Sequence, residues 1–98
     1  MIIVLGSAVV REEHFSEALA LSTEHVARSR AEPGCLAHAV HRDTENPLRL
    51  VFVEQWSDQA ALREHFKVPA SRSFAKALAG AASEPPKMSL YEAHEVPI

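Results

Sequence analysis

The residues best suited to chemistry lie between positions 54 and 65, where a carboxylate, the only tryptophan and a histidine follow one another. Glu54 and Trp56 are two residues apart, which in a strand places both side chains on one face. His65 follows in a stretch with helical spacing. An aromatic wall, a carboxylate and an imidazole that share a cavity could orient a small molecule and move a proton. We therefore predict that Trp56 and His65 are catalytic. The alternative is that Trp56 is core and Glu54 hydrogen-bonds a helix end or a backbone amide.

Two further histidines fall on one predicted strand, and only one of them can face such a cavity. His38 and His41 are an odd number of residues apart, so they point to opposite faces, and the register of the hairpin decides which points inward. The predicted substrate-binding residues are His38, His41, Phe52, Glu54, Phe74 and Tyr91. The histidines expected to be exposed are His14, His25 and His94.

Other common kinds of site are disfavoured by spacing. No two histidines are four residues apart on a predicted helix, and no strand carries a histidine pair separated by one residue, so we predict no metal site. The three glycines are far apart, which excludes a glycine-rich phosphate loop. The single Cys35 cannot form an internal disulfide, and a packing thiol is favoured over a nucleophile.

The elements that must position these residues can be predicted from apolar periodicity and breakers. Helical spacing after position 12 gives one apolar stripe, made of Phe15, Ala18, Leu19, Ser22, Val26 and Ser29. The predicted strands are Ile2–Val10, Cys35–Asp43, Leu48–Trp56 and Lys87–Ala93. The predicted helices are Glu12–Ala31, a second helix that Ser57 or Asp58 caps and that runs to about Lys67, and Ala70–Ala82. This β-α-β-β-α-β order predicts a ferredoxin-like α+β fold with a four-stranded antiparallel sheet.

Length and composition bound the class of protein. The 98 residues form one domain, with positions 94–98 as a tail. A net charge of −3 with scattered basic residues argues against nucleic acid and anionic membranes as partners. No apolar run approaches the roughly 20 residues of a spanning helix, and Met1 is followed by IIVLGSAVV without a basic leader, so we expect a cytoplasmic protein.

One face of the predicted sheet is left without a cover. The strands at Ile2–Val10 and Leu48–Trp56 carry apolar residues on both faces, whereas helices can cover only one. The economical cover is a second copy of the chain, packed face to face about a two-fold axis. We therefore expect a homodimer.

Several segments together resemble the antibiotic biosynthesis monooxygenase (ABM) domain family over nearly the whole chain. They are MIIVLGSAVV, HVARSRAEPGCL, HRDTENPLRLVFVEQWSDQAALREHF and MSLYEA. The resemblance implies a dimeric α/β barrel and a monooxygenase of quinols, polyphenols or polycyclic aromatics. Such an enzyme would use O2 without metal, flavin or haem, because the electron-rich substrate itself reduces oxygen. Trp56, His65 and Glu54 match family positions, the first two being pocket positions.

The chain also departs from the family pattern. Pro69 is followed by Ala70, where quinol-oxidising members tend to have a histidine, and His38 stands where they tend to have an aromatic residue. The asparagine and late-helix histidine of haem-degrading relatives are missing, with Ala75 at the latter position, which disfavours haem degradation. Two alternatives stay open: a non-catalytic dimeric module that binds or senses a small aromatic molecule, and an isomerase- or cyclase-like enzyme of the wider dimeric α/β-barrel group.

Overall fold

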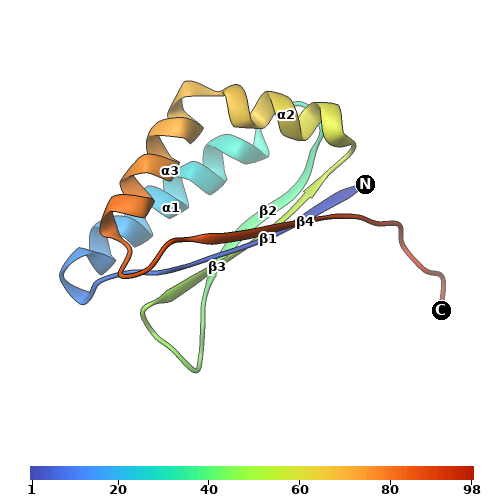
Figure 1. Cartoon of the computed structure of the whole chain (residues 1–98). Coiled ribbons are helices and arrows are strands. Elements are labelled where there is room, and N and C mark those ends of the chain that lie inside the picture. Colours follow the sequence, from blue (N-terminus) through green and yellow to red (C-terminus); the bar gives the residue numbers. More distant parts are fainter.

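The protein is a single antiparallel sheet with all its helices on one side (Figure 1). The computed structural model describes residues 1–98. Four strands lie in the order β2-β3-β1-β4. The strands are β1 (Ile2–Val9), β2 (Cys35–Arg42), β3 (Arg49–Trp56) and β4 (Lys87–Glu92). The helices are α1 (Phe15–Arg30), preceded by a 3₁₀ turn at Glu12–His14, α2 (Gln59–Lys67) and α3 (Pro69–Ala81). The predicted ferredoxin-like α+β fold is confirmed, with strand and helix ends within three residues of those predicted.

Strand β3 lies inside the sheet and sorts its side chains by parity. Leu50, Phe52, Glu54 and Trp56 are buried beneath the helices, while the residues between them are only half-buried on the other face. The register pairs Glu54 with Val4 of β1 and with His38 of β2. Residue pairs in register lie on the same face, so His38 also points toward the helices.

Helix α1 packs on the sheet through small and polar residues. Its buried positions are Ala18, Ser22, His25, Val26 and Ser29. The Ser22 and Ser29 hydroxyls donate to backbone carbonyls one turn earlier, which satisfies both of these buried groups. Small residues let the helix approach the sheet closely. Leu19, which was expected on this stripe, is instead 36% exposed, so that part of the prediction is wrong.

The turn that follows α1 packs against the start of α2. Gly34 has φ = +82°, a left-handed conformation that favours glycine. A Cβ at this position would lie 2.5 Å from the Cβ of Ala61. The Asp58 carboxylate accepts a hydrogen bond from the Ala61 amide at 2.8 Å and so begins α2. These contacts fix the distance between the end of α1 and the helix that carries His65.

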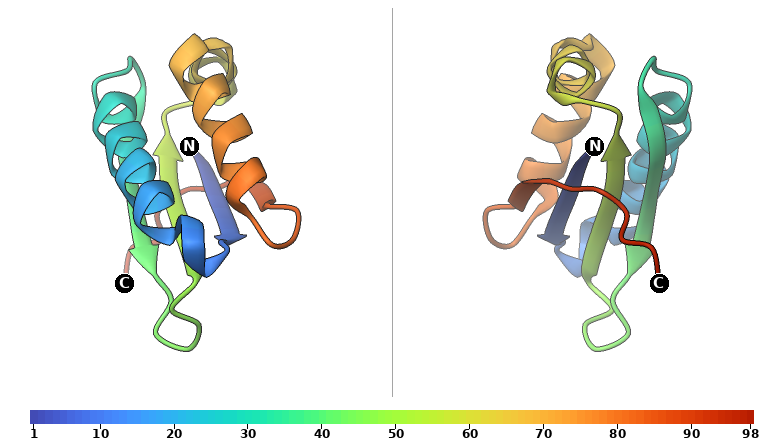
Figure 2. Two further views of the ribbon diagram at one scale, coloured as in Figure 1. Left: turned by 90° about the vertical axis from the view of Figure 1, so that its left-hand side faces the viewer. Right: turned by 90° about the vertical axis from the view of Figure 1, so that its right-hand side faces the viewer.

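The face of the sheet away from the helices stays open. Figure 2 shows α1 near the β2 edge and α3 toward the β1 and β4 edge, both on the same side. The open face carries half-buried Ile3, Val51 and Val53, with Leu5 45% and Tyr91 52% exposed. None of the helices is both long and apolar enough to cross a membrane.

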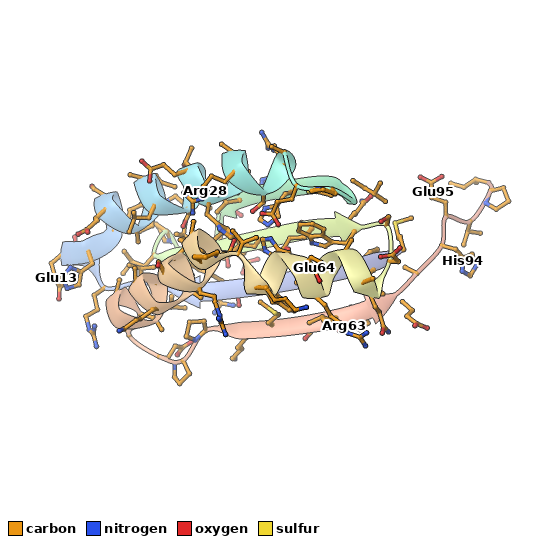
Figure 3. All side chains as sticks on the ribbon, turned by 90° about the horizontal axis from the view of Figure 1, so that it is seen from above. Glu13, Arg28, Arg63, Glu64, His94 and Glu95 are labelled. Carbon is orange, nitrogen blue, oxygen red and sulfur yellow. The ribbon has the colours of Figure 1, made fainter.

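Charged side chains lie on the outside of the helices. Seen from the helix side in Figure 3, Arg28, Arg63 and Glu64 lie on exposed helix surfaces, and the tail with His94 and Glu95 extends away from the domain. His14 and His94 are exposed, as the sequence predicts.

Replacing Gly34 by alanine should destabilise the fold by about 2 kcal/mol or more, because a left-handed non-glycine residue costs roughly 1–2 kcal/mol and the new Cβ meets Ala61. Urea unfolding followed by circular dichroism measures the change. Gly80→Ala is the matched control: its Cβ meets nothing within 4 Å, and a helical alanine is favoured by up to about 1 kcal/mol. Equal effects of the two substitutions would contradict the account of this turn.

Candidate active site

An apolar cavity of about 200 Å³ lies between the helices and the strands β1, β3 and β4. Phe52, Phe66, Phe74 and Met88 supply most of its apolar wall, and Gly6 of β1 lines it from the sheet. The polar groups that reach it include His25, Glu54, His65 and Ser71. A small apolar cavity with a few convergent polar groups is typical of a small-molecule site.

His65 on α2 is held in one orientation by Glu32 from the turn after α1. The Nδ1 atom of His65 lies 3.0 Å and 3.2 Å from the two carboxylate oxygens of Glu32. An ionised carboxylate can only accept, so Nδ1 carries the proton and donates it to Glu32. In the neutral ring the other nitrogen, Nε2, then has a free lone pair. His65 is only 4% exposed, yet it lines the cavity.

Glu54 lines the cavity and lies at the centre of a second cluster of polar residues, whose other members, Trp56 and His38, are buried behind the cavity wall. Its Oε1 accepts a hydrogen bond from the indole N–H of Trp56 at 2.9 Å. The Nε2 atom of His38 lies 3.2 Å from the same oxygen, at an angle too poor for a regular hydrogen bond. Burial raises the pKa of Glu54, but His38 and the Trp56 N–H outweigh it and hold that pKa below its ordinary value. Glu54 is therefore a buried anion.

His25 on α1 completes the polar side of the cavity. Its ring stacks on Phe74, with ring centroids 4.2 Å apart, and lies 5.2 Å from His38 and 5.4 Å from His65. Burial, together with His38 and His65, lowers the pKa of His25 from 6.5 to about 4. Its Nδ1 atom is buried without a hydrogen-bond partner. At neutral pH this ring is uncharged and offers a lone pair.

The structure divides the residues predicted from sequence into three groups. Phe52, Glu54, His65 and Phe74 line the cavity, as a substrate-binding role requires. Trp56 and His38 are buried behind its wall, and Trp56 touches His65 at a ring distance of 4.5 Å. His41 and Tyr91 lie in register with Val51 and Ile3, on the open face, so neither can contact the cavity. The hairpin register thus selects His38 as the inward histidine.

Two polar residues of the site were missed from the sequence. His25 was expected to be exposed, and that is wrong: it is 5% exposed. Its place three residues after Ser22 and four before Ser29 was a usable signal, because those positions share a helix face. Glu32 was not among the predicted site residues, because no local pattern could show that it reaches His65.

Cys35 has no role in this cavity. Burial and the nearby charge of Glu32 raise the pKa of its thiol, which keeps it protonated. It packs instead against the cluster that contains Ile2, Trp56 and Leu62. The structure agrees with the prediction of a packing thiol.

A family profile and one sequence relative match most of this chain. The sequence profile of the antibiotic biosynthesis monooxygenases (ABM) matches residues 1–77. An uncharacterized Synechocystis protein is 30% identical over 94 residues, which are 96% of this chain and 64% of that protein, so this chain spans less than two thirds of its relative.

Solved structures agree with the sequence match. The crystal structure of an antibiotic biosynthesis monooxygenase has a TM-score of 0.90 at 27% identity, covering 97% of this chain and all (100%) of that one. A candidate antibiotic biosynthesis monooxygenase from Deinococcus radiodurans has a TM-score of 0.93 at 26% identity, covering 100% and 97% of the two chains.

His25 should make the protein less stable in mild acid. Its pKa is 6.5 when unfolded and about 4 when folded, so the unfolded chain binds its proton first as pH falls. The free energy of unfolding is therefore not reduced by His25 above pH 6.5. It falls as the pH drops from 6.5 toward 4, by up to about 3 kcal/mol in total. Urea unfolding across this range, in chelator-treated buffer, measures the loss.

The substitution His25→Asn should flatten this pH dependence, because asparagine does not titrate. His14→Asn is the control, since His14 is exposed and its substitution should leave the profile unchanged. A steep profile that persists in His25→Asn would contradict the assignment to His25.

Proposed function

Because the chain belongs to the antibiotic biosynthesis monooxygenase family, we propose that it oxidises an electron-rich aromatic alcohol with O2 in the cavity beside His65. The substrate class is a quinol, polyphenol or polycyclic phenol small enough for about 200 Å³, or partly projecting from it. The observation that carries the proposal is the Glu32–His65 pair at the wall of an apolar cavity.

The first step is removal of a phenolic proton. Nε2 of His65 accepts this proton, and the carboxylate of Glu32 stabilises the resulting imidazolium through the Nδ1–H hydrogen bond. The apolar walls, Phe52 and Phe74 among them, exclude water that would otherwise solvate and quench the anion. An unsolvated phenolate is a much stronger electron donor than the phenol from which it formed.

The second step is the reaction of this anion with oxygen. A quinol with an unsubstituted ring carbon reacts with one O2 to give a hydroxyquinone and one water. One oxygen atom enters the ring, the other leaves as water, and the quinol supplies all four electrons. The reaction therefore needs no separate reductant. His65 returns its proton to the leaving water.

The same pair also suits proton transfer without oxygen, as an isomerase or cyclase would use it. Glu32 and His65 form a positioned base whichever bond is broken next. Consumption of O2 distinguishes the two reactions, because only the monooxygenase uses it. Binding without conversion of any compound would point to a non-catalytic module.

His65→Ala should lower kcat for oxygen uptake by about 100-fold or more, the usual contribution of a positioned general base. An oxygen electrode with a panel of hydroquinones and anthrones measures the rate. His14→Ala, an exposed histidine outside the cavity, should match the wild type. Failure of the whole panel to consume O2 above background would remove the support for the oxygenase, and equal rates for His65→Ala and wild type would exclude His65 as the base.

We further propose that the open face of the sheet is covered by a second copy of the chain. Ile3, Leu5, Val51 and Val53 form an apolar surface at the centre of this face, and Leu5 is 45% exposed. Sheets of two chains packed on these surfaces would bury them about a two-fold axis. Such a dimer leaves the helix-side cavity of each chain intact.

Leu5→Lys should shift the protein toward monomer, because it places a charge at the centre of this surface. Sedimentation velocity at micromolar concentration measures the shift. Leu19→Lys is the matched control, since Leu19 is exposed on α1, away from the open face. Wild-type protein that sediments as a monomer would exclude the face-to-face dimer.

A further inference from the structure

We propose that His25, His38 and His65 form a binding site for one divalent transition-metal ion of the zinc class. The three residues come from α1, β2 and α2, and one ring nitrogen from each lies within 4.8 Å of the others. The prediction of no metal rested on histidines that are close in sequence. The fold instead gathers three that are far apart in sequence, and one of them had been expected on the surface.

The histidines are buried and short of partners. They are 5%, 2% and 4% exposed, respectively. Nδ1 of His25 and both ring nitrogens of His38 lack a well-oriented hydrogen bond. Buried ring nitrogens without partners lose their hydration without compensation, typically at a cost of about 1–3 kcal/mol each. A metal ion between the rings would use lone pairs that no protein group uses.

Two of the three histidine rings, those of His38 and His65, each lie next to a carboxylate. Glu32 binds Nδ1 of His65 at 3.0 Å, and an oxygen of Glu54 lies 3.2 Å from Nε2 of His38. Metal-binding histidines usually donate their other ring N–H to such a group, which orients the ring and strengthens the lone pair. The two anions would also offset the charge of a divalent ion held by three neutral ligands.

The ring nitrogens are spaced somewhat more widely than a bound metal ion requires. Ligand nitrogens around tetrahedral zinc lie about 2.0–2.1 Å from the metal and hence roughly 3.3 Å from one another. A largest separation of 4.8 Å therefore requires the rings to turn inward by a small amount. Neutral imidazoles suit zinc, copper, iron and nickel, whereas calcium and magnesium prefer oxygen ligands.

The fourth ligand position would open into the cavity. His25 and His65 line that cavity, while His38 closes the site from behind. Three protein ligands and one open position are the arrangement that catalytic metal sites use. This inference does not rest on the monooxygenase proposal. The metal and a phenolic proton would compete for Nε2 of His65, so bound zinc should inhibit the reaction proposed above.

Calorimetric titration of the chelator-treated protein with Zn²⁺ tests the site, with Co²⁺ as a spectroscopic probe. The expected result is one ion per chain, visible absorption typical of tetrahedral Co²⁺, and a higher Tm with Zn²⁺, because the ion binds only the folded state. His25→Phe and His65→Phe should each weaken binding by more than about 100-fold. Glu32→Gln, which keeps all three rings, should weaken it by about 10–100-fold.

His14→Ala is the control and should bind as the wild type does, since His14 is exposed on the 3₁₀ turn. Circular dichroism checks the folding of each variant, and Glu32→Gln carries the test if a ring substitution unfolds the chain. Absence of stoichiometric binding at millimolar Zn²⁺ and Co²⁺ would overturn the proposal. So would binding that is unchanged in His25→Phe. These readouts involve no oxygen uptake, so they fail or succeed independently of the monooxygenase.

Discussion

The hydrogen bond from Nδ1 of His65 to Glu32 is the contact on which the site depends. It joins the turn after α1 to α2, and it leaves Nε2 of His65 as the free lone pair beside the cavity. The fold supplies what this contact requires. Gly34 adopts the left-handed turn that lets Glu32 approach α2, and Asp58 begins α2 at a fixed point above the sheet. Whether His65 acts as a base, as a metal ligand or as both, its role depends on this geometry.

The second constraint is the burial of charge and of unpaired nitrogens under the helices. Glu54 is an anion beneath the sheet-facing side of α1 and α2, and its partners are an indole N–H and a histidine ring. Such a polar group costs stability unless its hydrogen bonds are complete. Here they are not complete, because His25 and His38 retain unpaired ring nitrogens. His25, which carries one of these nitrogens, lines the cavity.

The sequence predicted the elements well because each depends on local physics. Alternation in β3, breakers at Pro33 and Pro69 and the cap at Asp58 are all visible within a few residues. The β-strand parity also predicted that Glu54 and Trp56 share a face. Contacts between elements could not be predicted in this way. Whether His38 or His41 faced inward required the hairpin register, and the approach of Glu32 to His65 required the positions of two helices. His25 was assigned to the surface although its spacing from Ser22 and Ser29 placed it on the buried face.

The protonation state of His65 tests the account most directly. Long-range ¹H–¹⁵N correlation spectra of the histidine rings, recorded on uniformly ¹⁵N-labelled, metal-free protein at neutral pH, distinguish a protonated ring nitrogen from one with a free lone pair. The structure predicts that the His65 ring is protonated at Nδ1 and bare at Nε2, and that Glu32→Gln removes this preference. A His65 ring protonated at Nε2, or one whose tautomer does not respond to Glu32→Gln, would contradict the account.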